Sequence, residues 1–155
     1  MAYTGSKAQA GRGTLLSIGG VTGSSSITFT PIGEVKSSGI SGASWGTEDV
    51  TNFDSGPDAE FIATIRDNGT IDLAGNRVSS EAGQILVEAA FGTGLKYDFK
   101  LVLPINAQAS QTTLGDTYTF SGLVQSRDFA VDVAKAITFS AKVKISGAVT
   151  LVVGS

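Results

Sequence analysis

Residues 137–146 decide the fold class, and they read Ile137–Thr138–Phe139–Ser140–Ala141–Lys142–Val143–Lys144–Ile145–Ser146. Odd positions are apolar and even positions are polar. Successive side chains of a β-strand point to opposite faces of a sheet, so the alternation predicts a strand with one buried and one solvated face. We expect the buried face to pack towards a helix and to consist of Ile137, Phe139, Val143 and Ile145. The solvated face then carries Thr138, Ser140, Lys142 and Lys144.

Similar alternation elsewhere predicts a chain built mainly of strands. We expect them at residues 12–20, 27–30, 59–67, 70–75, 97–103, 117–125 and 149–153. Asn68–Gly69 lies between two of these runs and predicts a tight hairpin turn, because both residue types tolerate positive φ. Pro31 cannot donate to a β-ladder, so it predicts a sheet edge or a strand end. Residues 105–116 and 127–135 are predicted as polar connections.

One segment, residues 79–91, has the period of a helix rather than of a strand. Its apolar residues recur at helical spacing and form one predicted stripe of Ala82, Ile85, Leu86 and Ala89. Ser79 or Ser80 can cap its start, and Glu81 suits the positive end of its dipole. The predicted fold is therefore mainly β, a β-sandwich or barrel with one helix at about residues 80–91 on its flank.

Composition points to a single domain without the usual catalytic groups. The chain has 155 residues, 41% of them hydrophobic, which suffices for a core. It contains no Cys and no His, so thiol nucleophiles, histidine bases and Cys/His zinc sites are excluded. The net charge of −3 provides no basic footprint for gripping nucleic acid. We expect residues 1–11 to be flexible, no membrane insertion, and assembly in the cytoplasm because no signal pattern is present.

Residues 37–58 form a long arm without clear strand or helix periodicity. The arm is rich in Ser and Gly, yet it carries Trp45, Asp49, Val50, Phe53 and Asp58. Structureless loops of this length are uncommon in compact domains and are often functional. Two interpretations stay open. The aromatic residues either become ordered against a partner, or the arm folds back and caps its own core with Trp45 as a plug.

Sequence motifs for ligands and catalysis are weak. Gly11–Arg12–Gly13 lacks the third glycine of a dinucleotide fingerprint. The run from Asp67 to Asp72 resembles a calcium loop but has Val78 where the bidentate acid belongs. The arm carries an acidic cluster of Glu48, Asp49, Asp54 and Asp58. No basic or aromatic pocket is evident beside this cluster, so a solvated or interface loop is favoured over acid–base catalysis. We expect no enzyme activity, no cofactor and no metal.

The order of these pieces resembles that of the major tail tube proteins of long, non-contractile-tailed (siphovirus-type) bacteriophages. The resemblance covers most of residues 27–153. It is carried by segments 49–51 and 58–65, the helix with Ala82–Leu86 and Ala90–Phe91, and segments 101–104, 115–122, 135–140 and 144–147. Each segment is weak alone, and their order and spacing make the resemblance more specific.

The resemblance implies a single tail tube domain over residues 1–155 without a C-terminal immunoglobulin-like domain. It implies a structural virion protein, made in the host cytoplasm, whose hexameric rings stack into a hollow tube. The implied partners are further copies, the tape-measure protein, and the tail tip and tail terminator proteins, with transient non-specific passage of genomic DNA. The arm would then contact neighbouring subunits or rings through Trp45, Asp49, Val50, Phe53 and Asp58.

The sheet offers candidates for the tube lining or for a seam between subunits, namely Asp67, Asp72, Lys142 and Lys144. Acidic residues suit a DNA conduit because a basic bore would retain the phosphate backbone. The two lysines fit an acidic bore poorly, unless nearby acids outnumber them or their strand does not line it. They could also simply form the solvated face of a strand.

A second function remains open from the sequence, a β-sandwich module that binds a ligand, for instance an adhesin or carbohydrate-binding domain. Such a module needs an exposed aromatic platform, which Trp45 together with Tyr3 or Tyr97 could supply.

Overall fold

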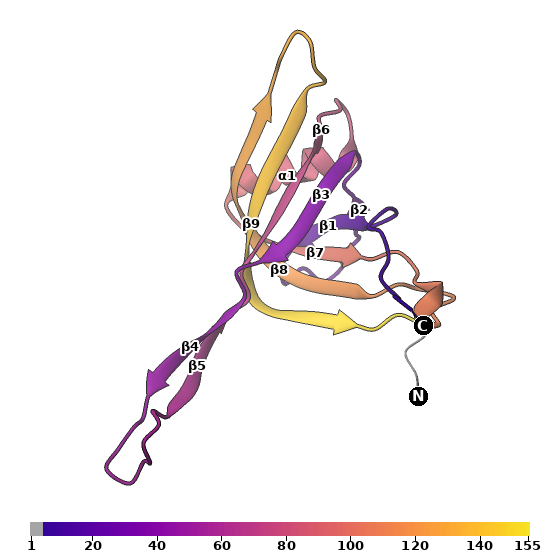
Figure 1. Cartoon of the computed structure of the whole chain (residues 1–155). Coiled ribbons are helices and arrows are strands. Elements are labelled where there is room, and N and C mark those ends of the chain that lie inside the picture. Colours follow the sequence, from indigo (N-terminus) through magenta and orange to yellow (C-terminus); the bar gives the residue numbers. More distant parts are fainter. Residues whose placement is uncertain (1–4) are drawn as a thin grey trace.

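The computed structural model describes residues 5–155, and β-strands dominate them (Figure 1). The elements in chain order are β1 (Leu15–Val21), β2 (Thr30–Pro31), β3 (Val35–Ser41), β4 (Ser44–Asp49), β5 (Phe61–Asp67), β6 (Thr70–Asn76), α1 (Ala82–Thr93), β7 (Lys96–Val102), a short 3-10 turn (Ala107–Ala109), β8 (Thr117–Ala130) and β9 (Thr138–Val152). The mainly β class and the flanking helix are confirmed.

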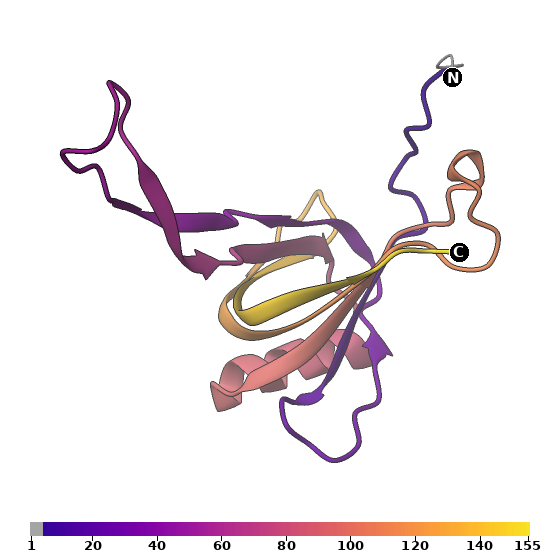
Figure 2. The ribbon, with the colours of Figure 1, turned by 90° about the horizontal axis from the view of Figure 1, so that it is seen from below.

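Seven of the strands form one sheet in the order β2-β1-β7-β8-β9-β6-β3, and β4 and β5 form a separate two-stranded sheet. The large sheet curls, so that the layer containing β3, β6 and β9 lies above the layer of β1, β7 and β8 (Figures 1 and 2). The long strands β8 and β9 run through both layers. Pro31 lies in the edge strand β2, as its missing donor predicts.

Strand β9 contains the alternating run from Thr138 onward, and the predicted two faces are confirmed there. Ile137, predicted for the buried face, lies before the strand and is 44% exposed. Phe139, Val143 and Ile145 are buried, whereas Lys142 is exposed. The strand is longer than predicted, because it continues through Gly147, whose φ of 86° introduces a bend rather than an end. Its neighbour β8 likewise extends to Ala130, so the predicted polar connection at 127–135 is strand in its first part.

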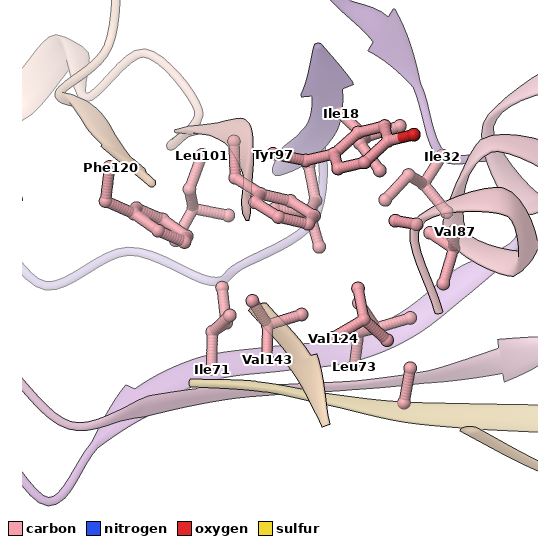
Figure 3. Close-up of a cluster of buried hydrophobic side chains, with 14 of the residues drawn as sticks. Ile18, Ile32, Ile71, Leu73, Val87, Tyr97, Leu101, Phe120, Val124 and Val143 are labelled. Atoms are coloured by element: carbon pink, nitrogen blue, oxygen red, sulfur yellow. The ribbon is translucent and has the colours of Figure 1, made fainter. Parts of the chain in front are cut away.

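The hydrophobic core fills the space inside the curl, between the two layers (Figure 3). Phe99 and Phe120 stack there with ring centroids 5.7 Å apart. Ile71, Leu73 and Val143 approach them from the opposite layer and are almost fully buried. Burial of this apolar surface is what holds the curl closed.

Helix α1 covers the flank of the curl, but with a different face from the predicted stripe. Gly83, Gln84, Val87 and Ala90 are buried, while Ile85 lies half exposed. The reason is the close approach of the helix to β2, where a Cβ on Gly83 would lie 2.3 Å from the carbonyl oxygen of Pro31. The predicted serine cap is also wrong, because Glu81 is the N-cap and accepts from the Gln84 amide.

Gln84 explains why a polar residue occupies the buried face of α1. Its side-chain amide donates to the carbonyl oxygens of Gly33 and Asn76 at 3.1 and 2.9 Å. Its side-chain oxygen accepts from the Val78 amide at 3.1 Å. The buried amide is thus satisfied, and it ties the helix to the segments that flank it.

The predicted hairpin at Asn68–Gly69 is wrong, although both of its strands exist. Strand β5 pairs with β4, whereas β6 pairs with β3 and β9. The chain passes at Asn68–Gly69 from the two-stranded sheet into the large one. Gly69 has a φ of 86°, and a Cβ there would lie 2.0 Å from the Ser41 carbonyl oxygen. Glycine is needed at this crossing for close approach, not for a hairpin turn.

The N-terminal segment lies along the 105–116 loop. Residues 1–11 are predicted to be flexible, and the first four of them lie outside the described residues. Residues 5–11 are exposed, and Asn106 donates to the Lys7 carbonyl oxygen at 2.9 Å. Among the described residues no helix has the length and apolar character that crossing a bilayer requires.

Candidate assembly surface

Strands β4 and β5 form a ribbon, named here with its connecting loop as residues 44–67, that projects from the body of the protein (Figures 1 and 2). The arm predicted as loop at 37–58 therefore contains β4 and part of β3. Its backbone is satisfied by pairs such as Glu48–Ile62 and Asp49–Phe61. Because the ribbon points away from the core, the idea that it folds back with Trp45 as a plug is wrong.

Large apolar side chains lie exposed along the ribbon. Phe53 at its distal end is fully exposed, and Trp45 near its base is 55% exposed. Strand β5 adds Phe61, Ile62 and Ile65 on its two faces. The Arg66 guanidinium lies over the Trp45 ring at 5.3 Å. Large apolar side chains left exposed together on one element mark a site for protein contact.

The distal loop of the ribbon is held by its own hydrogen bonds. The Asn52 amide donates to the Ser55 hydroxyl at 3.0 Å, and that hydroxyl donates to a Glu60 carboxylate oxygen at 2.5 Å. Hydrogen bonds from the Thr51 side chain and amide hold the pKa of Asp49 below its ordinary value. Asp49 therefore orders the start of the loop that carries Phe53.

At the base of the ribbon lies an open hollow of about 640 Å³, termed here the base hollow. Its lining joins Trp45, which the sequence assigned to the arm, with Asp67 and Lys144, which the sequence assigned to the tube lining or seam. The remaining lining comes from β5 and from the bend of β9, and it includes Ile65, Arg66, Asn68, Ile145, Ser146, Gly147 and Ala148. The hollow thus combines apolar walls with charged side chains.

The two lysines of β9 lie opposite acidic residues. The Lys144 ammonium is 2.6 Å from the Asp67 carboxylate. This hydrogen bond, together with one from the Gly69 amide, holds the pKa of Asp67 below its ordinary value. Lys142 is the direct cross-strand partner of Asp72. Opposite charges facing each other across an antiparallel pair are favourable, so this face of β6 and β9 is close to neutral.

The acids of the arm do not gather into a reaction centre. Asp58 lies in the distal loop with Asp54, while Glu48 and Asp49 end strand β4. Within residues 5–155 no group of three or more His, Cys, Asp or Glu side chains is placed to hold a metal ion. The second proposed platform partner of Trp45, Tyr97, is only 8% exposed and belongs to the core. Tyr3, the other, lies outside the described residues.

Solved structures with a similar architecture identify the fold of this chain. A chain from the tail of an empty gene transfer agent particle, solved with helical refinement and C6 symmetry, superposes with a TM-score of 0.70 over 94% of this chain and 99% of that chain, at 21% identity. The chain has the tail tube fold. The SPP1 tail tube matches with a TM-score of 0.63 over 92% of this chain and 77% of that one, at 13% identity.

A further solved structure shares the fold. A chain of the baseplate of the anti-feeding prophage, a six-fold symmetrised structure, matches with a TM-score of 0.68 at 8% identity, over 97% of this chain and 98% of that one. No protein-family profile and no curated protein sequence matches the chain significantly. The likeness is therefore one of fold, recognisable in three dimensions well after the sequences have diverged.

Sequence reasoning missed part of the exposed surface. It placed Phe61 and Ile65 in the first strand of a hairpin, whereas the ribbon leaves both faces of that strand exposed. It also left Val131 and Val133 in a polar connection, although both are highly exposed at the turn between β8 and β9. Their apolar alternation with Phe129 was the available signal.

Proposed function

We propose that this chain is a structural tail subunit whose copies form hexameric rings, and that the rings stack into a hollow tail tube serving as a conduit for DNA. The observation that carries the proposal is the fold match over nearly the full length of a chain in a C6-symmetric tail. The proposed role is structural and not enzymatic. Its place is the tail of a virion or of a phage-like particle.

The exposed ribbon supports self-association. An isolated two-stranded ribbon is at best marginally stable in water, so a ribbon that carries Trp45, Phe53 and Ile65 in the open gains stability by packing on another surface. We propose that it contacts a neighbouring subunit or ring through Trp45, Asp49, Val50, Phe53 and Asp58. Other proposed partners are the tape-measure protein and the tail tip and terminator proteins.

The charges of the β6–β9 face fit a conduit that does not retain DNA. Duplex DNA carries about one negative charge per 1.7 Å of its axis, so a strongly basic lining would bind it. In this chain Lys144 is paired with Asp67, and Lys142 lies opposite Asp72. We propose that this face lines the bore or forms the seam between adjacent subunits.

Electron microscopy of the purified protein tests the proposal. Negative-stain images over a range of protein concentrations should contain rings, and at high concentration tubes. Analytical ultracentrifugation of the same samples should show a species of six chains or larger. A protein that stays a monodisperse monomer at every concentration, also with a tape-measure fragment added, would contradict the proposed function.

A further inference from the structure

The turn between β8 and β9 is the second exposed apolar feature of the molecule. We define the β8–β9 tip as residues 128–137, the last residues of β8 together with the turn that extends beyond the last sheet pair between Ala130 and Thr138. Val131 is 73% exposed, Val133 is fully exposed, and Phe129 and Ile137 are about half exposed. The Asp132 carboxylate accepts from the Ala134 amide at 2.9 Å, so the turn has its own local order.

The β8–β9 tip and the base hollow lie at opposite ends of the ladder between β6 and β9. The tip joins β9 at Thr138, and the hollow contains Lys144 to Ala148 further along that strand. Figure 1 shows the ribbon leaving the large sheet at the end of β3 and β6 that is remote from the β8–β9 turn. One copy of the chain can therefore not place its own tip in its own hollow.

The two surfaces match in chemistry as well as in position. Both surfaces carry exposed apolar side chains, and the net charges of the two surfaces have opposite signs. The charged residues at the tip are Asp128, Asp132 and Lys135, two acids and one base, which gives a charge of −1. The charged residues of the hollow are Arg66, Asp67 and Lys144, two bases and one acid, which gives a charge of +1.

We propose that the β8–β9 tip of one copy docks into the base hollow of a second copy. Val131 and Val133 would pack against Trp45 and Ile65, and the acidic tip would face Arg66. We assign a second copy as the occupant because every copy of the chain carries both complementary surfaces, the β8–β9 tip and the base hollow, at opposite ends of the β6–β9 ladder. A contact between unlike surfaces leaves one tip and one hollow free, so it propagates in one direction.

This inference rests on the proposed function, in which it assigns the contact that stacks one ring on the next. It gives the ribbon base a role distinct from that of the distal loop. The distal loop with Phe53 remains free to contact another subunit. The base hollow would be filled from the neighbouring ring, and the polarity of the stack would follow from the direction of β9.

Charge reversal on each side tests the inference. The variant Val131→Lys with Val133→Lys changes the tip from −1 to +1, and the variant Arg66→Asp changes the hollow from +1 to −1. Each alone places like charges in contact, which opposes association. We expect each to raise the concentration at which half of the protein is assembled by at least tenfold. The variant with all three substitutions has a tip of charge +1 and a hollow of charge −1, so it should assemble again.

A matched control adds the same two charges on another exposed surface, as Ile85→Lys with Ala89→Lys on the outer face of α1. This control should assemble like the wild type. Circular dichroism and the thermal unfolding midpoint establish that each variant is folded. Ultracentrifugation and negative-stain microscopy then report the assembly, and Arg66→Asp still tests the contact should the double-lysine tip not fold.

The outcomes separate the inference from the proposed function. Wild-type tubes together with equally long tubes from both charge-reversed variants would overturn the docking contact and leave the tail tube function standing. Head-to-tail chains of wild-type protein that are not tubes, and that both variants abolish, would support the docking contact against the proposed function. A wild type that stays monomeric would overturn both, and restored assembly in the triple variant supports the docking contact.

Discussion

At the scale of single residues, Gly83 fixes the distance between α1 and the sheet. A Cβ added there would lie 2.3 Å from the Pro31 carbonyl oxygen and 2.5 Å from the Ile32 Cα. Gly83→Ala should therefore destabilise the protein, because overpacking against backbone costs about 1–3 kcal/mol and exceeds the roughly 1 kcal/mol gain in helix propensity. The measurement is the free energy of unfolding in urea.

Gly92 in the same helix provides the matched control for Gly83. A Cβ on Gly92 would meet no atom within 4 Å. Gly92→Ala should stabilise the protein by about 0.5 kcal/mol, because it reduces the entropy of the unfolded chain without a clash. If both alanine variants gain stability equally, the close approach of α1 to β2 is wrong.

The pair Asp67–Lys144 makes a second prediction at this scale. The hydrogen bond from Lys144 lowers the pKa of Asp67, so Lys144→Ala should raise it towards the ordinary value of 3.8. Because the folded pKa is the lower one, the pair stabilises the protein above the unfolded pKa and loses this effect as pH falls through the folded pKa. Carboxyl chemical shifts followed by NMR from pH 2 to 6 measure the change.

Asp49 is the internal control of that titration. Its pKa is lowered by Thr51, which does not contact Lys144. The Asp49 titration should therefore be the same in the wild type and in Lys144→Ala. A lowered Asp67 pKa that persists without Lys144 would show that the Gly69 amide, which also donates to Asp67, is sufficient.

At the scale of elements, the ribbon couples an ordered loop to an exposed aromatic side chain. Phe53 contributes nothing to the core, so Phe53→Ala should change the free energy of unfolding by less than about 0.5 kcal/mol. It should nevertheless reduce assembly at least tenfold, since aromatic side chains dominate protein interfaces. Ile85→Ala, which removes exposed apolar surface from α1, is the control and should leave assembly unchanged. Equal assembly of the wild type and Phe53→Ala would exclude the distal loop from the interface.

Elements with one buried and one solvated face could be predicted from the sequence. The alternation in β9 gave the correct faces because only one of them meets the core. The ribbon could not be found in this way, because β4 and β5 are exposed on both faces and no burial constrains their pattern. Its pairing depends on Gly42 and Gly69, which lie against each other where the chain leaves and re-enters the large sheet.

The candidate site was predictable only in pieces for the same reason. Trp45, Asp67 and Lys144 were each identified from the sequence, but their meeting in the base hollow depends on the angle at which the ribbon leaves the sheet. Helix α1 is the opposite case. Its apolar stripe was visible, yet the buried face was set by Gly83, a residue that contributes no side chain to the pattern.

At the scale of the whole molecule, the charge balance of the β6–β9 face decides how an assembled tube would treat DNA. Asp67→Asn together with Asp72→Asn would leave Lys142 and Lys144 without their acidic neighbours. Tubes of this variant should bind a short DNA duplex at least tenfold more tightly at low salt, with an affinity that falls steeply as salt is added. Fluorescence anisotropy of labelled DNA measures both effects. Glu48→Gln with Asp54→Asn makes the same change of net charge on the ribbon, and its tubes should bind DNA no better than wild-type tubes. If the two double variants bind DNA equally well, the β6–β9 face does not line the bore, and the paired lysines belong to a seam between subunits instead.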